Sequence, residues 1–309
     1  MKLRAFSLLE LSIVFVVIGI LVSGISAGID LYQDFRLATA RTLTLNSRVG
    51  RIEDLSLWVE TSSDKSFTKT NPSQGEFIGE WRDINPLNNN KAKFIQNTQN
   101  YKPKYIKIGI GGIPSLEFNP LKTAENVTFL NLNNNYVDIN TNNTIFIVFN
   151  PYLLGGMLLV SSNSSNYDYR ILIQSQMEGA TYPSVSSKKI RYSLTNLQNT
   201  TAIEIDKDTA FSSNDVMENN AQIVGLKRDF NLNKYSIKLN NSVKYTTKTM
   251  EDSNIINSNL TIGMLNASGS DKRQFSGQIS EIIIFNKALS DKEYEDVESY
   301  LKNKYSIKF

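Results

Sequence analysis

The feature that most constrains this chain is an uninterrupted apolar segment near its N-terminus. No charged residue occurs between Glu10 and Asp30, and residues 11–25 are apolar or small. A helix that rises about 1.5 Å per residue crosses the roughly 30 Å hydrocarbon core of a bilayer in about 20 residues. The segment therefore predicts a membrane-spanning helix. Glu10 lies at its entrance, where an unpaired charge in lipid costs about 2.5–3.5 kcal/mol.

The residues before this segment do not follow the pattern of a secretory signal peptide. The apolar run is longer than the 7–15 residues of a signal core, and no A-x-A cleavage site follows it. The small residue Ala5 and Phe6 precede the run instead. Cleavage between them would free an α-amino group on Phe6, one helical turn from Glu10. We expect this amine and carboxylate to satisfy each other, within one chain or between neighbouring chains.

The same residues resemble the N-terminal motif of type IV pilins and pseudopilins. The resemblance rests on a leader with Lys2 and Arg4, on Ala5 and Phe6, and on the sequence Ser7-Leu8-Leu9-Glu10-Leu11. The family usually has Gly before the cut, where this chain has Ala5. The resemblance implies that a prepilin peptidase removes residues 1–5 and methylates Phe6. It also implies that Glu10 pairs with the Phe6 amine of an adjacent subunit during assembly. An uncleaved membrane anchor is the alternative.

Beyond the apolar segment, mixed polar and apolar residues predict that the helix continues, so that it spans residues 6–50. Its apolar residues recur at spacings of three and four and predict one packing face: Phe35, Ala38, Thr42, Leu45 and Val49. Gly50 is a candidate terminator. In the pilin interpretation, the first half of the helix packs in a filament core and the second half docks on a head domain.

Composition limits the chemistry of the chain. Its 309 residues include no cysteine and no histidine. Disulfides, thiolate metal sites, cysteine nucleophiles and histidine bases are therefore excluded. The formal net charge of +3 provides no extended basic field, so a nucleic-acid partner is not expected. No cofactor is expected, although calcium is common in the fold suggested below.

After residue 50 the pattern changes to short alternating segments separated by Asn- and Ser-rich turns, which is typical of an all-β sandwich. The predicted strands are 55–60, 79–83, 105–108, 144–149, 157–160, 169–173, 221–226, 234–239, 243–245, 260–263 and 278–285. A capping box, Ser290-Asp291-Lys292-Glu293, then predicts a terminal helix. The asparagine runs 88–90 and 133–135 are interpreted as loops.

The C-terminal third resembles the concanavalin A-like, laminin-G-type lectins. The matching residues are Gly277, Ile279 and Glu281, followed by Asn286-Lys287-Ala288-Leu289-Ser290 and by Leu301-Lys302-Asn303-Lys304-Tyr305. Segments 57–60, 81–83, 102–105 and 114–119 resemble earlier parts of that family. The resemblance implies a mainly β chain, in which a long N-terminal pilin-type helix precedes a jelly-roll β-sandwich over residues 51–309 that ends in a short helix.

Candidate ligand-binding residues follow from sugar chemistry, which uses aromatic platforms with polar neighbours. Tyrosines and one acid lie in or beside loops: Tyr152, Tyr167, Asp168, Tyr169 and Tyr182. The alternative is that these tyrosines simply pack on a sheet. Asp215, Asn266 and Asp271 are loop oxygens without a readable calcium-ligand spacing.

Two acidic clusters are candidate catalytic sites. Glycosidases place paired carboxylates on one face of a strand, and Glu204 and Asp206 alternate in that way, with Asp208 following. A third acid of the hydrolase type is missing. The second cluster, Glu293-Tyr294-Glu295-Asp296, falls on the terminal helix. We therefore do not expect an enzyme.

Together these features predict a pilin-like subunit, either a minor pilin or a pseudopilin, of a type IV pilus or a type II secretion-like filament. Its head would be adhesive and would bind a glycan or a surface protein. The expected location is the bacterial inner membrane, with a single span, and then the pilus surface or a periplasmic pseudopilus. Two alternatives stay open: a membrane-held glycan-processing enzyme and a pseudopilin that presents secretion substrate.

Overall fold

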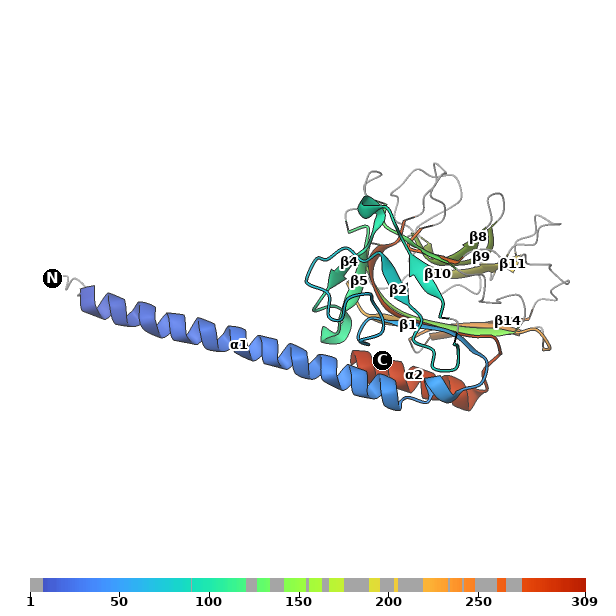
Figure 1. The fold of residues 1–309 in the computed structure, drawn as a ribbon. Coiled ribbons are helices and arrows are strands. Elements are labelled where there is room, and N and C mark those ends of the chain that lie inside the picture. The colour runs from blue at the N-terminus through green and yellow to red at the C-terminus, as the bar shows by residue number, and fades with distance from the viewer. Residues whose placement is uncertain are drawn as a thin grey trace, which may run out of the picture.

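A long helix, a two-sheet β-sandwich and a C-terminal helix make up the protein (Figure 1). This computed structural model confirms the predicted fold class. It describes residues 8–89, 91–120, 127–133, 142–153, 156–162, 167–174, 189–194, 203–204, 219–232, 234–240, 242–247, 260–264 and 274–309.

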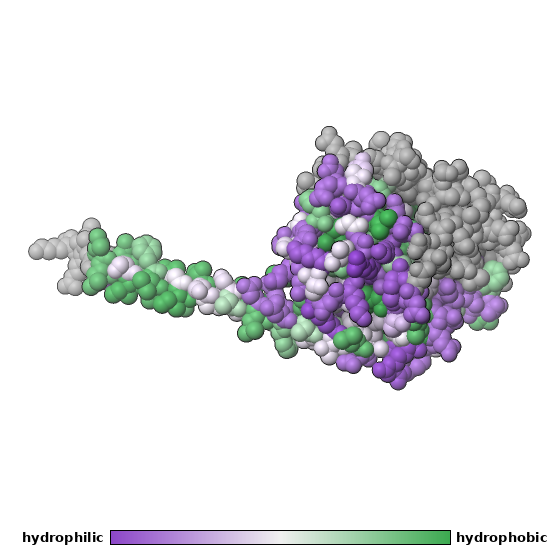
Figure 2. Space-filling view, in the orientation of Figure 1, coloured by the Kyte–Doolittle hydropathy of each residue, from purple (hydrophilic) through white to green (hydrophobic). Residues whose placement is uncertain are grey.

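Helix α1 (Leu8–Asn46) has 39 residues and is about 58 Å long at the usual rise per residue. Its N-terminal half projects away from the sandwich, and no residue from Leu8 to Tyr32 is buried. Figure 2 shows apolar side chains along this half, in contrast to the largely hydrophilic part of the head visible in that view. Within the described ranges, this helix alone is long and apolar enough to cross a membrane.

The predicted packing face of this helix is wrong, although Val49, just beyond the end of the helix, is buried as predicted. Phe35 and Leu45 are 66% and 82% exposed, and the opposite face packs on the head through Ala40 and Thr44. Thr44 forms a hydrogen bond to Tyr300 there. The apolar stripe that begins at Phe35 consequently faces away from the head.

The end of the helix also differs from the prediction. Helix α1 ends at Asn46, because the Ser47 backbone N–H bonds to the carbonyl of Thr44, three residues back. Gly50 lies instead in a short 3₁₀ helix, η1 (Val49–Arg51). The tightened turn satisfies the last carbonyls and redirects the chain into the first strand.

Two antiparallel sheets form the sandwich. Across sheet A the order is β14 (Ser242–Thr247), β13 (Lys234–Leu239), β12 (Gln222–Asp229), β7 (Asn143–Leu153), β16 (Ser276–Phe285), β5 (Ser115–Phe118) and β4 (Lys104–Ile106). Strand β1 (Leu55–Glu60) lies off this path and pairs with the C-terminal half of β16. Across sheet B the order is β11 (Ile203–Glu204), β10 (Lys189–Leu194), β9 (Tyr167–Gln174), β8 (Gly156–Ser162), β15 (Leu260–Ile262), β6 (Leu130–Leu132), β3 (Lys93–Ile95) and β2 (Glu80–Arg82). Short 3₁₀ helices η2 (Gln99–Tyr101) and η3 (Ile110–Gly112) lie in the connections.

The chain has two apolar layers. One fills the space between the sheets and includes Trp81, Phe94 and Phe149. The other lies between the outer face of sheet A and helix α2 (Asp291–Tyr305), where Val297 and Leu301 are fully buried. The predicted capping box of α2 is confirmed. Both helices thus lie on the sheet A side of the sandwich (Figure 1).

The packing of α1 leads to a prediction about fragments. A fragment that begins at residue 30 keeps Ala40 and Thr44 on the head and should be a soluble, β-rich monomer. A fragment that begins at residue 51 loses these contacts and should be less stable by at least about 2 kcal/mol, because buried hydrogen bonds each contribute about 0.5–1.5 kcal/mol. Urea unfolding followed by circular dichroism compares the two. Equal midpoints would contradict a stabilising role for the second half of α1.

Candidate functional site

A buried ionic cluster joins α2 to sheet A. The Lys304 ammonium donates to Glu281 Oε2 at 2.8 Å and to Glu60 Oε2 at 3.0 Å, and all three side chains are completely buried. Glu60 ends β1, Glu281 lies in the middle of β16, and the two residues are cross-strand partners. This register explains why two acids, far apart in the sequence, face one lysine.

Neutral donors complete the cluster around Glu281. Its carboxylate accepts from Trp58 Nε1 at 2.7 Å, from the Tyr305 hydroxyl at 2.8 Å and from the Tyr300 hydroxyl at 2.9 Å. Burial raises the pKa of Glu281, although the adjacent Lys304 opposes this shift. Burial alone would lower the pKa of Lys304, but the two carboxylates more than offset that effect and raise it.

Helix α1 contacts the same cluster from outside. Thr44 Oγ1 lies 3.1 Å from the Tyr300 hydroxyl, in a buried hydrogen bond. Nearer the exposed apolar half of α1, Arg36 donates to the Gly111 carbonyl at 2.5 Å and to Ser306 Oγ at 3.0 Å. The Arg36 guanidinium therefore lies at the C-terminus of α2, where the helix dipole favours a positive charge. The cluster of Glu60, Glu281 and Lys304 is closed to solvent, so we assign it a structural role. Through the hydrogen bond between Tyr300 and Thr44 it helps to hold α1 on the head.

The structure separates the ligand-binding residues predicted from the sequence. Tyr152 lies at the end of β7 in sheet A, whereas Tyr167, Asp168 and Tyr169 belong to β9 of sheet B. By register, the β9 tyrosines pair with Ser161 and Ser162, at the end of β8 far from Tyr152. Tyr182 lies outside the described residues. Of the five predicted residues, Tyr152 thus lies on sheet A and three lie on β9 of sheet B, and their role in binding stays a prediction.

Tyr152 has a hydrogen-bonded environment of its own on the outer face of sheet A. Its hydroxyl donates to Glu117 Oε1 at 2.8 Å and accepts from Gln278 Nε2 at 2.6 Å. Burial, reinforced by the bond to Glu117, raises the pKa of Tyr152 to about 12. The hydroxyl thus donates one hydrogen bond and accepts one within the sheet, and one acceptor lone pair is left.

The acidic and calcium candidates are not assembled into a site in the part of the chain that the structure describes. Glu204 lies on β11, and Asp206 and Asp208 are outside the described residues, as are Asp215, Asn266 and Asp271. Glu293 forms the capping box, and Asp296 pairs with Arg48 and Lys292. No group of three or more metal-ligating side chains occurs among the described residues.

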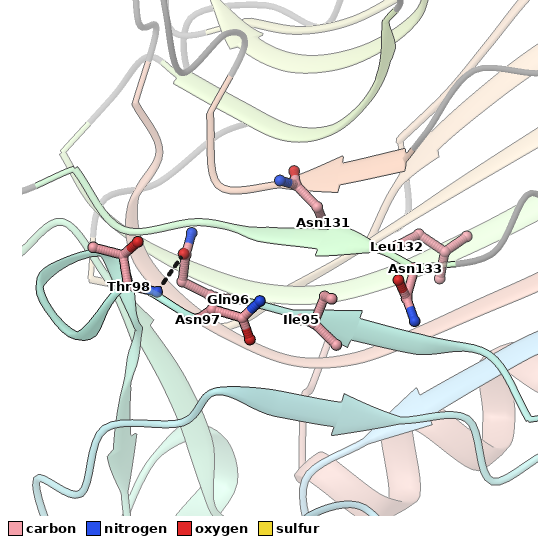
Figure 3. A pocket seen from close by; sticks show the side chains of 7 residues that line it. All are labelled: Ile95, Gln96, Asn97, Thr98, Asn131, Leu132 and Asn133. Carbon is pink, nitrogen blue, oxygen red and sulfur yellow. Dashed lines mark hydrogen bonds between the residues drawn. The ribbon is translucent and has the colours of Figure 1, made fainter.

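An amide-lined groove lies on sheet B, across the sandwich from the two helices. It has a volume of about 370 Å³ and is formed by β3, β6 and the segment that follows β3 (Figure 3). Its lining residues are neutral: Ile95, Gln96, Asn97, Thr98, Asn131, Leu132 and Asn133. Buried Phe94 and Leu132 pair across the inner face, so alternation places their neighbours Ile95 and Asn131 together on the outer face.

Two of the groove amides are held in place by the fold. Gln96 Oε1 accepts from the Thr98 backbone N–H at 2.9 Å, the bond drawn in Figure 3. Asn131 Oδ1 accepts from Thr261 Oγ1 at 2.8 Å, which leaves its amide N–H groups as donors. Asn97 and Asn133 are exposed, and their side chains make no hydrogen bond within the described residues. The groove thus combines two carboxamides that the fold holds in place with two whose side chains bond to no described residue.

Neither β3 nor β6, the two strands that form this groove, was predicted from the sequence. Each has only three residues, and the equally short β2 and β4 were predicted only through the longer segments 79–83 and 105–108 that contain or overlap them. The carboxamide side chains at positions 96, 97, 131 and 133 were the sequence signal that could have indicated the groove. Asn133 was interpreted as part of a loop, and it does directly follow β6.

No profile of a known protein family matches the chain, and no curated protein matches it. Among solved structures, the binding domain of botulinum neurotoxin serotype D is similar, with a TM-score of 0.53 and 14% identity over 83% of this chain and 53% of that one. A second structure of the receptor-binding domain of botulinum neurotoxin D gives a TM-score of 0.52 and 13% identity over 81% of this chain and 53% of that one. The chain thus spans about half the length of these structures, and the likeness shows the fold alone. The head shares the two-sheet β-sandwich fold of these structures.

Proposed function

We propose that this protein is a pilin-like subunit that carries a lectin-like binding head on a membrane-derived helix. The observation that carries the proposal is the division of α1 into two parts. Residues 8–32 are all exposed and contain the apolar segment 11–25, and the second half is fixed to the head by Arg36, Ala40 and Thr44. A single rigid rod of this kind can first anchor the head in a bilayer and later pack in a filament.

The stripe that faces away from the head supports packing between subunits. Exposed apolar residues continue from the membrane segment through Leu31 and Phe35 to Leu45. An exposed apolar stripe of this length favours burial against another helix. Neighbouring copies of α1 supply such helices, and the bulky head then favours a minor subunit or a tip position.

The proposal includes removal of a leader, which provides its direct test. We expect native protein to begin at methylated Phe6, because Ala5 and Phe6 precede the apolar run in the arrangement typical of prepilins. Mass spectrometry of the N-terminal peptide from membranes or sheared filaments measures this. Mature protein that retains residues 1–5 would overturn the pilin assignment and leave a plain membrane anchor.

For the head, we propose binding of a glycan without turnover. The alternative, a membrane-held glycan-processing enzyme, requires paired accessible carboxylates. Glu60 and Glu281 both contact Lys304, but both are fully buried and therefore inaccessible to a glycan. Measuring reducing-sugar release from the glycans that the protein binds separates the two functions, and sustained release would favour the enzyme.

A further inference from the structure

We infer that the amide-lined groove on β3 and β6 is a binding site for an uncharged carbohydrate. This inference rests on the proposed glycan-binding function of the head and names the site and the class of sugar. The volume of about 370 Å³ lies at the lower end of the range for small-molecule sites. That size suits one or two sugar units, with the rest of a longer glycan in solvent.

The chemistry of the lining selects hydroxyl groups. A carboxamide presents both donors and acceptors, and a sugar hydroxyl likewise does both. Asn131 offers oriented donors, and Asn97 and Asn133 offer both kinds of group. Ile95, opposite Asn131 on the neighbouring strand, supplies an apolar surface for the C–H face of a sugar ring.

The electrostatics of the groove disfavour an acidic ligand. None of the seven lining residues is charged. On the neighbouring strand β2, Glu80 lies opposite Ile95 and is already paired with Lys93 and Arg82. A carboxylate or phosphate ligand would thus find no cation among the lining residues, whereas a neutral ligand needs none.

The position of the groove within the sheet disfavours an extended peptide. Strand β3 lies between β2 and β6, and β6 lies between β3 and β15, so neither strand has a free edge. A peptide could not add to the sheet by backbone pairing. Recognition must instead come from side chains, as in sugar binding.

Two aromatic residues lie beyond Gln96, outside the set that lines the groove. The Gln96 amide reaches the Phe129 carbonyl at 3.5 Å, and the Phe129 ring lies 5.7 Å from the Tyr101 ring. Phe129 is buried, whereas Tyr101 is 39% exposed. The groove also lies across the sandwich from α1, and therefore stays accessible when the helix is in a membrane or filament.

The test uses the full chain in detergent micelles and a panel of immobilised oligosaccharides, neutral ones alongside sialylated ones. We expect binding to neutral members. Asn131→Ala and Asn133→Ala should each weaken that binding about tenfold, and Asn97→Trp, which fills the groove, should abolish it. Asn303→Ala removes an equally exposed amide from α2 and is the matched control, with affinity expected to be unchanged.

Each of the following outcomes would overturn the inference. Neutral-glycan binding that survives all three groove substitutions would place the site elsewhere on the head. Binding confined to sialylated members would refute the choice of an uncharged sugar, and binding to none of the panel would refute carbohydrate recognition by the groove. None of these results bears on whether the subunit is processed at Phe6, which the N-terminal mass tests separately.

Discussion

Replacing Lys304 by Met is expected to lower the free energy of unfolding of the head by about 3–5 kcal/mol, the usual cost of breaking a buried ion pair. The substitution preserves much of the side-chain volume but removes the only ammonium that contacts Glu60 and Glu281 within the described structure. Two buried carboxylates would then face each other without compensation. Each would have to bind a proton or be exposed to solvent.

Tryptophan fluorescence during urea unfolding measures this effect directly. The chain has two tryptophans, and Trp58 donates its indole N–H to Glu281. Lys308→Met is the control, because Lys308 is exposed and the substitution removes the same charge. Adding Glu60→Gln to Lys304→Met should restore part of the stability by removing one uncompensated carboxylate. A midpoint equal to that of Lys308→Met would show that the ion cluster contributes little.

Replacing Glu10 by Ala is expected to reduce the amount of this subunit in filaments to background. In the proposed function, Glu10 neutralises the methylated amine of Phe6 on the adjacent subunit, and without it that cation would enter the apolar filament core unpaired. Insertion into the membrane should not suffer, since removing a charge makes insertion easier by up to about 2.5–3.5 kcal/mol. Loss of assembly could then not be attributed to failed insertion.

Immunoblots of membranes and of sheared filaments from the same cells provide the measurement. Asp30→Ala is the matched control, because Asp30 is an exposed acid on the same helix, beyond the apolar run. The control should insert, lose its leader and assemble normally. Normal quantities of the Glu10→Ala protein in filaments would refute the pairing role of Glu10.

Much of the fold could be predicted because it is encoded by short-range patterns. Strand β1 was predicted with its observed bounds, and β16 was predicted to within two residues, since long buried strands leave a clear run of apolar residues. The capping box of α2 is likewise local, because Ser290 and Glu293 lie within one turn. Tyr152 shows the limit of such patterns, because its hydrogen bonds to Glu117 and Gln278 join three strands of sheet A that no local pattern pairs.

By itself, the sequence determined that the chain has one membrane-length helix, a β-sandwich and a capped terminal helix, because hydrophobic periodicity and capping act between neighbouring residues. Only the tertiary structure decided which face of α1 meets the head, which two acids share Lys304, and which strands form the groove. Those choices depend on residues more than twenty positions apart that strand register and helix docking bring together. A periodic pattern shows that a face will be buried, but the partner that covers it is fixed by the rest of the fold.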